Sequence, residues 1–268
     1  MDFETPQLKK AESIPAREAE VQIECLERPD VVSQAIFELK QSFAALGIDK
    51  WKLPAVKIKF LETQGEAVLG RVGKVTANEV EIEYDKQFSS IELEGLLIEG
   101  LKNSGVNYPG MKQTLKHELA HIAMWSVTGL ERQPATRLLD EGWASLVEHG
   151  NEVASVNNVK SVVKNGFQNE PEFFNRCLDF SKPITFEENL NSAEYSTGQA
   201  LLTFIKEKFG TEKMVELIQK SPATERRSDL TDGQFEPASN QFSTALLEVT
   251  GFQNVDEVRS EFLKWLSE

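Results

Sequence analysis

The amino-acid sequence predicts an α+β fold, in which a small mixed or antiparallel sheet is followed by a mostly helical C-terminal subdomain. Segments whose apolar and polar residues alternate lie in the first third of the chain, which is typical of half-buried strands. Beyond residue 150 the pattern is helical with long loops. Forty per cent of the 268 residues are apolar, which is enough for a buried core.

The first part of the chain divides into a lead-in and a subdomain. Residues 1–28 contain many charged side chains without periodicity, which predicts a flexible lead-in. Residues 29–110 are expected to form an N-terminal subdomain of one helix and the small sheet. Its helix is predicted by apolar side chains that recur at helical spacing from Val31 to Leu46, and Gly47 ends the pattern.

Three strands are expected after this helix. Residues 55–61 alternate apolar and basic side chains, with the period of two that indicates a half-buried strand. Residues 68–72 and 79–84 indicate two further strands, separated by turn-forming Gly and Asn residues. Residues 91–101 are expected to form a helix, and a loop rich in helix-breaking residues leads from it to residue 110.

The third part, residues 111–268, opens with the motif H-E-x-x-H, which contains two of the three histidines of the chain. On a helix, four residues advance by about 400° and roughly 6 Å, so His117 and His121 project from one face. Two imidazoles on one face can bind a metal ion. The Glu118 carboxylate lies beside that face, where it could accept a proton from a metal-bound water.

Glu141 is the candidate for a third metal ligand, and nineteen residues separate it from His121. A Gly and a Pro between them predict that one helix ends and another begins. Two antiparallel helices, over 111–127 and 135–149, would bring Glu141 opposite the histidines across about 8–10 Å. Two imidazoles, one carboxylate and one open position form the ligand set of a catalytic zinc.

Other polar residues are candidates for supporting roles. A metal-bound histidine usually donates its second ring N–H to an acceptor. Glu148, and after it Ser145, lie near the Glu141 face of the second helix and are expected to be such acceptors. Cys25 and Cys177 are isolated in the sequence and are poor candidates as ligands.

The H-E-x-x-H motif, followed by E-G-W-A-S-L-V-E at 141–148, resembles the gluzincin metallopeptidases, namely the M1 aminopeptidase family and its small bacterial relatives of the MA type. The resemblance covers roughly residues 55–268. It implies a thermolysin-like zincin catalytic core, with the small sheet packed on the H-E-x-x-H helix. It also implies one Zn²⁺ per chain, with His117, His121 and Glu141 as its ligands.

The same resemblance implies the catalytic roles. Glu118 would be the general base, and Tyr195, which precedes a long amphipathic helix, would stabilise the transition state. M1 aminopeptidases also carry a G-x-M-E-N strand, whose glutamate holds the free amino terminus of the substrate. This chain lacks that pentapeptide, and Glu79 is the candidate for the role. Endopeptidase and exopeptidase action therefore both stay open.

The expected function is that of a zinc-dependent metallopeptidase, which hydrolyses a peptide or protein substrate with zinc-activated water. Two alternatives are a catalytically degenerate zincin-fold binding protein and a zinc hydrolase of a non-peptide amide. The intact Glu118 argues against the degenerate protein, because a structural zinc site needs no base.

Composition excludes several other classes. A formal net charge of −14 opposes nucleic-acid binding, because a phosphate backbone would be repelled. No apolar run reaches the roughly 18–20 residues that a membrane span requires. The N-terminus lacks the hydrophobic core of a secretion signal, and two cysteines fit a reducing compartment. A cytoplasmic location is expected, with a secreted or lipid-anchored origin left open for a trimmed chain.

Overall fold

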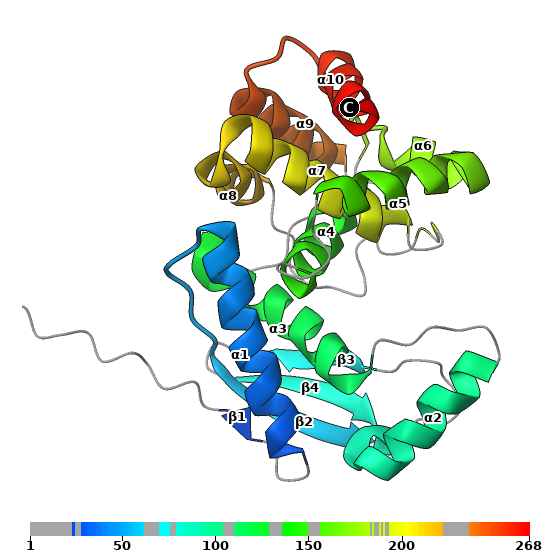
Figure 1. Ribbon diagram of the computed structural model, residues 1–268. Helices are drawn as coiled ribbons and strands as arrows, with labels where there is room; N and C mark the ends of the chain where they lie inside the picture. Colours follow the sequence, from blue (N-terminus) through cyan, green and yellow to red (C-terminus); the bar gives the residue numbers. More distant parts are fainter. Residues whose placement is uncertain are drawn as a thin grey trace, which may run out of the picture.

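A small sheet and a group of helices make up the molecule (Figure 1). The computed structural model describes residues 23–24, 28–61, 70–75, 79–103, 110–128, 136–149, 156–182, 184, 188, 190, 193–221 and 236–268. In Figure 1 the sheet and helices α1 to α3 occupy the lower part, and helices α4 to α10 gather in the upper part. Within the described residues, no helix combines the length and the apolar character needed to cross a bilayer.

The sheet is mixed, and its described strands follow the order β1-β2-β4-β3. The strands are β1 (Ile23–Glu24), β2 (Ala55–Leu61), β3 (Gly70–Val75) and β4 (Glu79–Asp85). Strands β1 and β4 run parallel to β2, whereas β3 pairs with β4 in the antiparallel sense. The parallel pair β2 and β4 places buried Val56 beside Val80 and Ile58 beside Ile82.

The predicted strands agree with these elements, with two differences. Strand β3 begins two residues later than expected, and residues 68–69 lie outside the described part. Strand β1 falls within the expected lead-in 1–28 and was not predicted, because two residues are too few to show an alternation. Residues 1–22 and 25–27 of that lead-in also lie outside the described part.

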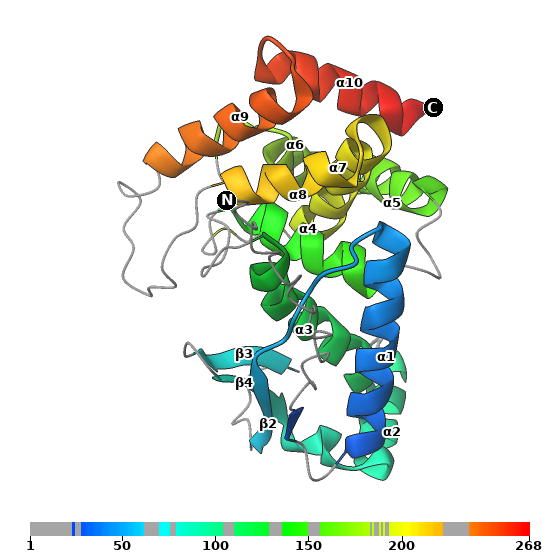
Figure 2. The same ribbon diagram turned by 90° about the vertical axis from the view of Figure 1, so that its left-hand side faces the viewer.

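Three helices accompany the sheet. They are α1 (Pro29–Leu46), α2 (Ile91–Asn103) and α3 (Met111–Thr128). Helix α1 begins with a proline, whose fixed φ suits the first helical turn, and ends at Gly47 in the left-handed conformation, with φ 76°. Figure 2 shows α3 between the sheet and α1. The predicted helices over 30–46, 91–101 and 111–127 are confirmed to within about two residues.

The upper group contains the remaining helices. Helix α7 is the long amphipathic helix expected after Tyr195, but it begins at Ala193, so Tyr195 lies in its first turn. The described helices of this group are α4 (Arg137–Glu148), α5 (Val156–Asn169), α6 (Pro171–Cys177), α7 (Ala193–Phe209), α8 (Thr211–Lys220), α9 (Glu236–Thr250) and α10 (Val255–Ser267).

Helix α3 is enclosed on more than one side. Its apolar stripe, which includes Met111, Leu115 and Leu119, is fully buried. On another face the indole N–H of Trp143 in α4 donates to the Ala120 carbonyl oxygen over 2.9 Å. This buried hydrogen bond joins α4 to the helix that carries both predicted histidine ligands.

The N-terminus of α3 is held by a carboxylate from α2. Glu94 accepts a hydrogen bond from the Met111 backbone N–H over 2.6 Å, which satisfies one of the unpaired amides at a helix start. The other oxygen of Glu94 pairs with the buried Arg28 guanidinium over 3.0 Å, and Arg28 also donates to the Phe88 carbonyl oxygen. This network fixes the position of the first turn of α3 relative to α2 and to the start of α1.

Helices α4 and α7 touch backbone to backbone at a pair of glycines. A Cβ atom added to Gly142 would overlap the backbone of Gly198, and one added to Gly198 would overlap the Leu138 carbonyl oxygen. Only glycine therefore permits this approach. The contact fixes α7 directly over the part of α4 that carries Glu141.

We expect Gly198→Ala to destabilise the protein by about 1–3 kcal/mol or more, because a methyl group must force the two backbones apart. Thermal and urea unfolding would measure the change in the free energy of unfolding. Gly95→Ala in α2 is the matched control, since a Cβ there meets no atom within 4 Å. The control should be neutral or stabilising by roughly 0.5–1 kcal/mol. Equal effects of both substitutions would contradict the steric account.

Candidate metal centre

Helices α3 and α4 lie side by side and antiparallel, as predicted. Lys116 near the start of α3 donates to the Glu148 carbonyl oxygen at the end of α4 over 2.6 Å. One turn later in α3, His121 contacts Asp140 and Glu141 near the start of α4. The later residue of α3 therefore contacts the earlier residue of α4, so the two helices are antiparallel.

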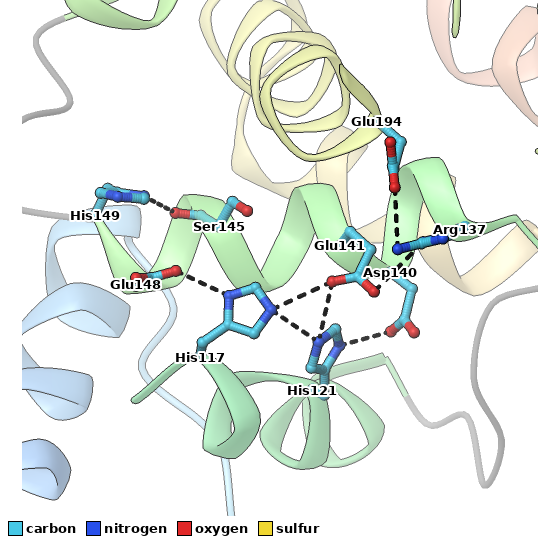
Figure 3. Close-up of polar contacts among 9 residues, drawn as sticks. All are labelled: His117, His121, Arg137, Asp140, Glu141, Ser145, Glu148, His149 and Glu194. Carbon is cyan, nitrogen blue, oxygen red and sulfur yellow. Dashed lines mark hydrogen bonds and ion pairs between the residues drawn. The ribbon is translucent and has the colours of Figure 1, made fainter. Parts of the chain in front are cut away.

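The three predicted ligands converge between these helices (Figure 3). The two Nε2 atoms of His117 and His121 lie 3.2 Å apart. Glu141 Oε2 lies 3.2 Å from the first of these nitrogens and 3.5 Å from the second. One ligand atom from each residue lies within 4.8 Å of the others, so the group could hold a metal ion.

Two further carboxylates contact the outer nitrogens of the rings. His117 Nδ1 lies 2.8 Å from Glu148 Oε2, and His121 Nδ1 lies 2.9 Å from Asp140 Oδ1. A neutral imidazole that donates its Nδ1 proton to a carboxylate presents a lone pair at Nε2. With both rings in this neutral form, the two Nε2 lone pairs and the Glu141 carboxylate would face one point, where a bound cation would satisfy all three acceptors.

The donor set is one that can bind a metal ion, with two imidazole nitrogens and one carboxylate oxygen. Carboxylate partners behind the histidines fix the orientation of the rings. Asp140 is nearly inaccessible, with 2% of its side chain exposed, so its partner His121 cannot turn freely. The expectation for Glu148 agrees with its contact to His117.

Sequence reasoning missed Asp140 and placed Ser145 in a role that the described contacts do not give it. Ser145 contacts a histidine through its backbone carbonyl oxygen, which accepts from His149 Nδ1 over 2.9 Å. The sequence feature that could have identified Asp140 is its position directly before Glu141. Neighbouring helix positions point about 100° apart, so one acid can face the metal position while the next faces the back of a ring.

The histidines and the carboxylates of this site change one another's pKa values. Burial lowers the pKa of His117, but hydrogen bonds to Glu141 and Glu148 outweigh it and raise this pKa to about 9. Burial raises the pKa of Glu141, but hydrogen bonds to both histidines outweigh it and hold this pKa far below its usual range. Glu141 is therefore ionised, which is the form in which a carboxyl group can bind a metal ion.

Glu118 lies beside the histidines without sharing their hydrogen bonds. It is half-buried, and burial raises the pKa of its carboxyl group above the ordinary value. The described residues provide no hydrogen-bond donor to its carboxylate. A carboxyl group with a raised pKa holds a proton more readily than an ordinary one, which suits a group that accepts and releases protons.

Tyr195 reaches the site from the first turn of α7. Its ring stacks beside the His117 ring, with the centroids 5.9 Å apart and the planes 27° from parallel. The tyrosine also lies beside Arg137, the first residue of α4, whose guanidinium carbon is 5.7 Å from the Tyr195 ring centroid. Sequence reasoning did not single out Arg137 or Glu194, which the guanidinium contacts over 3.0 Å.

Glu79, the candidate for binding the substrate amine, is the first residue of β4 and pairs with Ala55 of β2. The position of its side chain lies outside the described part of the structure. Its predicted role stays a prediction.

We expect Asp140→Asn and Glu148→Gln each to weaken metal affinity by about 10- to 100-fold, because each removes the carboxylate that orients a ligand imidazole. Competition with a chromophoric chelator would measure the affinity. The amide variants keep size and shape, so folding should be retained. Unchanged affinity in either variant would contradict the corresponding orienting role.

No protein-family model matches this chain, and no curated protein or solved structure matches it. The function is therefore inferred from the geometry of the site.

Proposed function

We propose that this protein is a zinc-dependent metallopeptidase of gluzincin type, with a thermolysin-like catalytic core. The observation that carries the proposal is the convergence of His117, His121 and Glu141 within 4.8 Å, beside the Glu118 carboxylate and the Tyr195 ring. A metal site that served structure alone would need neither a base nor a phenol next to it. The resemblance of the motif at 117–121 and of residues 141–148 supports the same conclusion.

The chain's own residues divide the chemistry between them. A bound zinc would polarise the scissile carbonyl group and acidify water, which is the Lewis-acid contribution. Glu118 accepts a proton from the attacking water and later passes it to the leaving amine. The Tyr195 hydroxyl donates a hydrogen bond to the carbonyl oxygen as that atom gains negative charge.

The proposal can be tested with the purified, zinc-loaded full chain and a mixed peptide library. Cleavage that chelation abolishes and zinc restores is the expected result, and the cleavage positions would distinguish endopeptidase from exopeptidase action. Stoichiometric zinc without cleavage of peptides or other amides would favour a degenerate binding protein. Cleavage of simple amides alone would favour a hydrolase of non-peptide substrates.

We expect Tyr195→Phe to lower the rate of peptide hydrolysis by about 10²–10³-fold, because it removes one preorganised donor to the developing oxyanion. The ring remains, so stacking on His117 and metal content should be kept. Steady-state kinetics with a cleaved library peptide would measure the loss. Tyr84→Phe, in the buried part of β4, is the matched control and should retain activity. A Tyr195→Phe protein with full activity would remove Tyr195 from the mechanism.

A further inference from the structure

Arg137 brings a fixed positive charge to the edge of the candidate metal centre. It begins α4, one turn before Glu141, and its side chain is 22% exposed (Figure 3). Its Nε lies 3.7 Å from Glu141 Oε1. The oxygen facing the histidines is the other one, Oε2. Arg137 thus approaches the ligand carboxylate from the side away from the metal position.

The same guanidinium contacts Tyr195 of α7. Its carbon lies over the ring, 5.7 Å from the ring centroid, which is within the range of a cation–π interaction. The Tyr195 ring therefore has a charged neighbour on α4, and this neighbour restricts the orientation of the ring.

Glu194, in the first turn of α7, anchors the guanidinium. Its Oε1 lies 3.0 Å from Arg137 Nη2, and 2% of its side chain is exposed. Its second oxygen is buried and has no hydrogen-bond partner in the described part of the chain. A buried carboxylate is costly unless a cation accompanies it, so Arg137 and Glu194 hold each other in place.

We propose that Arg137 is a positioning residue, which orients the Glu141 carboxylate and the Tyr195 ring together, and that Glu194 holds Arg137 for this task. The proposal rests on the proposed function, because the orientation of Tyr195 matters only where the site carries chemistry. Arg137 joins the third ligand on α4 to the oxyanion donor on α7. Its contacts with two carboxylates and a phenol occupy the guanidinium, which argues against a role in binding a substrate carboxylate.

The test uses Arg137→Ala, Arg137→Lys and Glu194→Gln in the full chain. The matched control is Arg176→Ala, because Arg176 makes a comparable pair with Glu188, at 2.7 Å, without contact to the metal centre. In the zinc-loaded protein we expect Arg137→Ala to lower kcat by about 10- to 100-fold with little change in KM, since misplaced groups slow the reaction step. Arg137→Lys should lower kcat less than Arg137→Ala does, because lysine keeps the positive charge but lacks the planar guanidinium group with its several N–H donors. Glu194→Gln should lower kcat in the same direction, and Arg176→Ala should leave kcat unchanged.

A second measurement does not depend on activity. Each variant is loaded with Co²⁺, whose visible absorption reports the coordination geometry, and the spectra are compared with that of the unsubstituted protein. Arg137→Ala should change this spectrum while the protein still binds one equivalent of Co²⁺, because Glu141 is free to turn. Arg176→Ala should leave the spectrum unchanged. Should Arg137→Ala fail to fold, Arg137→Lys and Glu194→Gln carry both measurements.

The outcomes separate the two proposals. An unchanged Co²⁺ spectrum together with unchanged kcat in the Arg137 variants would overturn the positioning role. A rise in KM alone, confined to peptides with a free C-terminal carboxylate, would also overturn it in favour of substrate binding. If the unsubstituted protein cleaves no peptide, the proposed function fails, and the Co²⁺ spectrum still decides whether Arg137 orients Glu141.

Discussion

Glu118→Gln is expected to lower peptide hydrolysis by about 10²–10⁴-fold while the protein keeps its metal. The amide matches the size of the carboxylate but cannot accept a proton from water. Glu118 is absent from the hydrogen bonds that join the histidines to Glu141, so its replacement leaves the ligand set intact. Loss of rate without loss of metal is therefore the signature of the general base.

Metal content by elemental analysis and single-turnover kinetics on one library peptide would measure this result. Glu212→Gln, an exposed position in the first turn of α8, is the matched control and should behave as the unsubstituted protein. Hydrolysis at full rate by pure Glu118→Gln protein would show that another group accepts the proton.

Glu141→Ala is expected to abolish both metal binding and hydrolysis. It removes the sole carboxylate that contacts both Nε2 atoms among the described residues, and two imidazoles alone form an incomplete zinc site. The loss of affinity should exceed the roughly 10- to 100-fold that an outer partner contributes. It also removes the Glu141 hydrogen bond that helps to raise the His117 pKa, so this pKa should fall.

Zinc titration followed by thermal unfolding would measure the second prediction. A metal that binds the folded chain raises the unfolding temperature in proportion to ln(1 + [metal]/Kd), so the variant should lose the zinc-dependent rise. Glu212→Ala should keep that rise. If Glu141→Ala still binds one zinc with unchanged affinity, Glu141 is not a ligand.

The ligand set could be predicted from the sequence because it depends on short-range geometry. His117 and His121 lie four residues apart on one helix, and helical periodicity alone places them on one face. Glu141 followed from the length of the connection, since two helices with a short link must pack side by side. The structure brings the three side chains together as these arguments expect.

The surrounding residues could not be predicted in the same way. The partner of His121 depends on how far α4 is rotated about its own axis, and a rotation by one residue separates Asp140 from Glu141. The contact between Arg137 and Glu194 joins positions 57 residues apart. It exists because the glycine crossing lets α7 approach α4, and no local pattern in the sequence specifies a crossing between helices.

The direct contact of Gly142 with Gly198 restricts motion between two helices of the candidate site. Helix α4 carries Glu141 and α7 carries Tyr195, and the two backbones meet with no side chain between them. We therefore expect α4 and α7 to move as one rigid block. Under the proposed function, Glu141 and Tyr195 would keep their separation while substrate enters and product leaves.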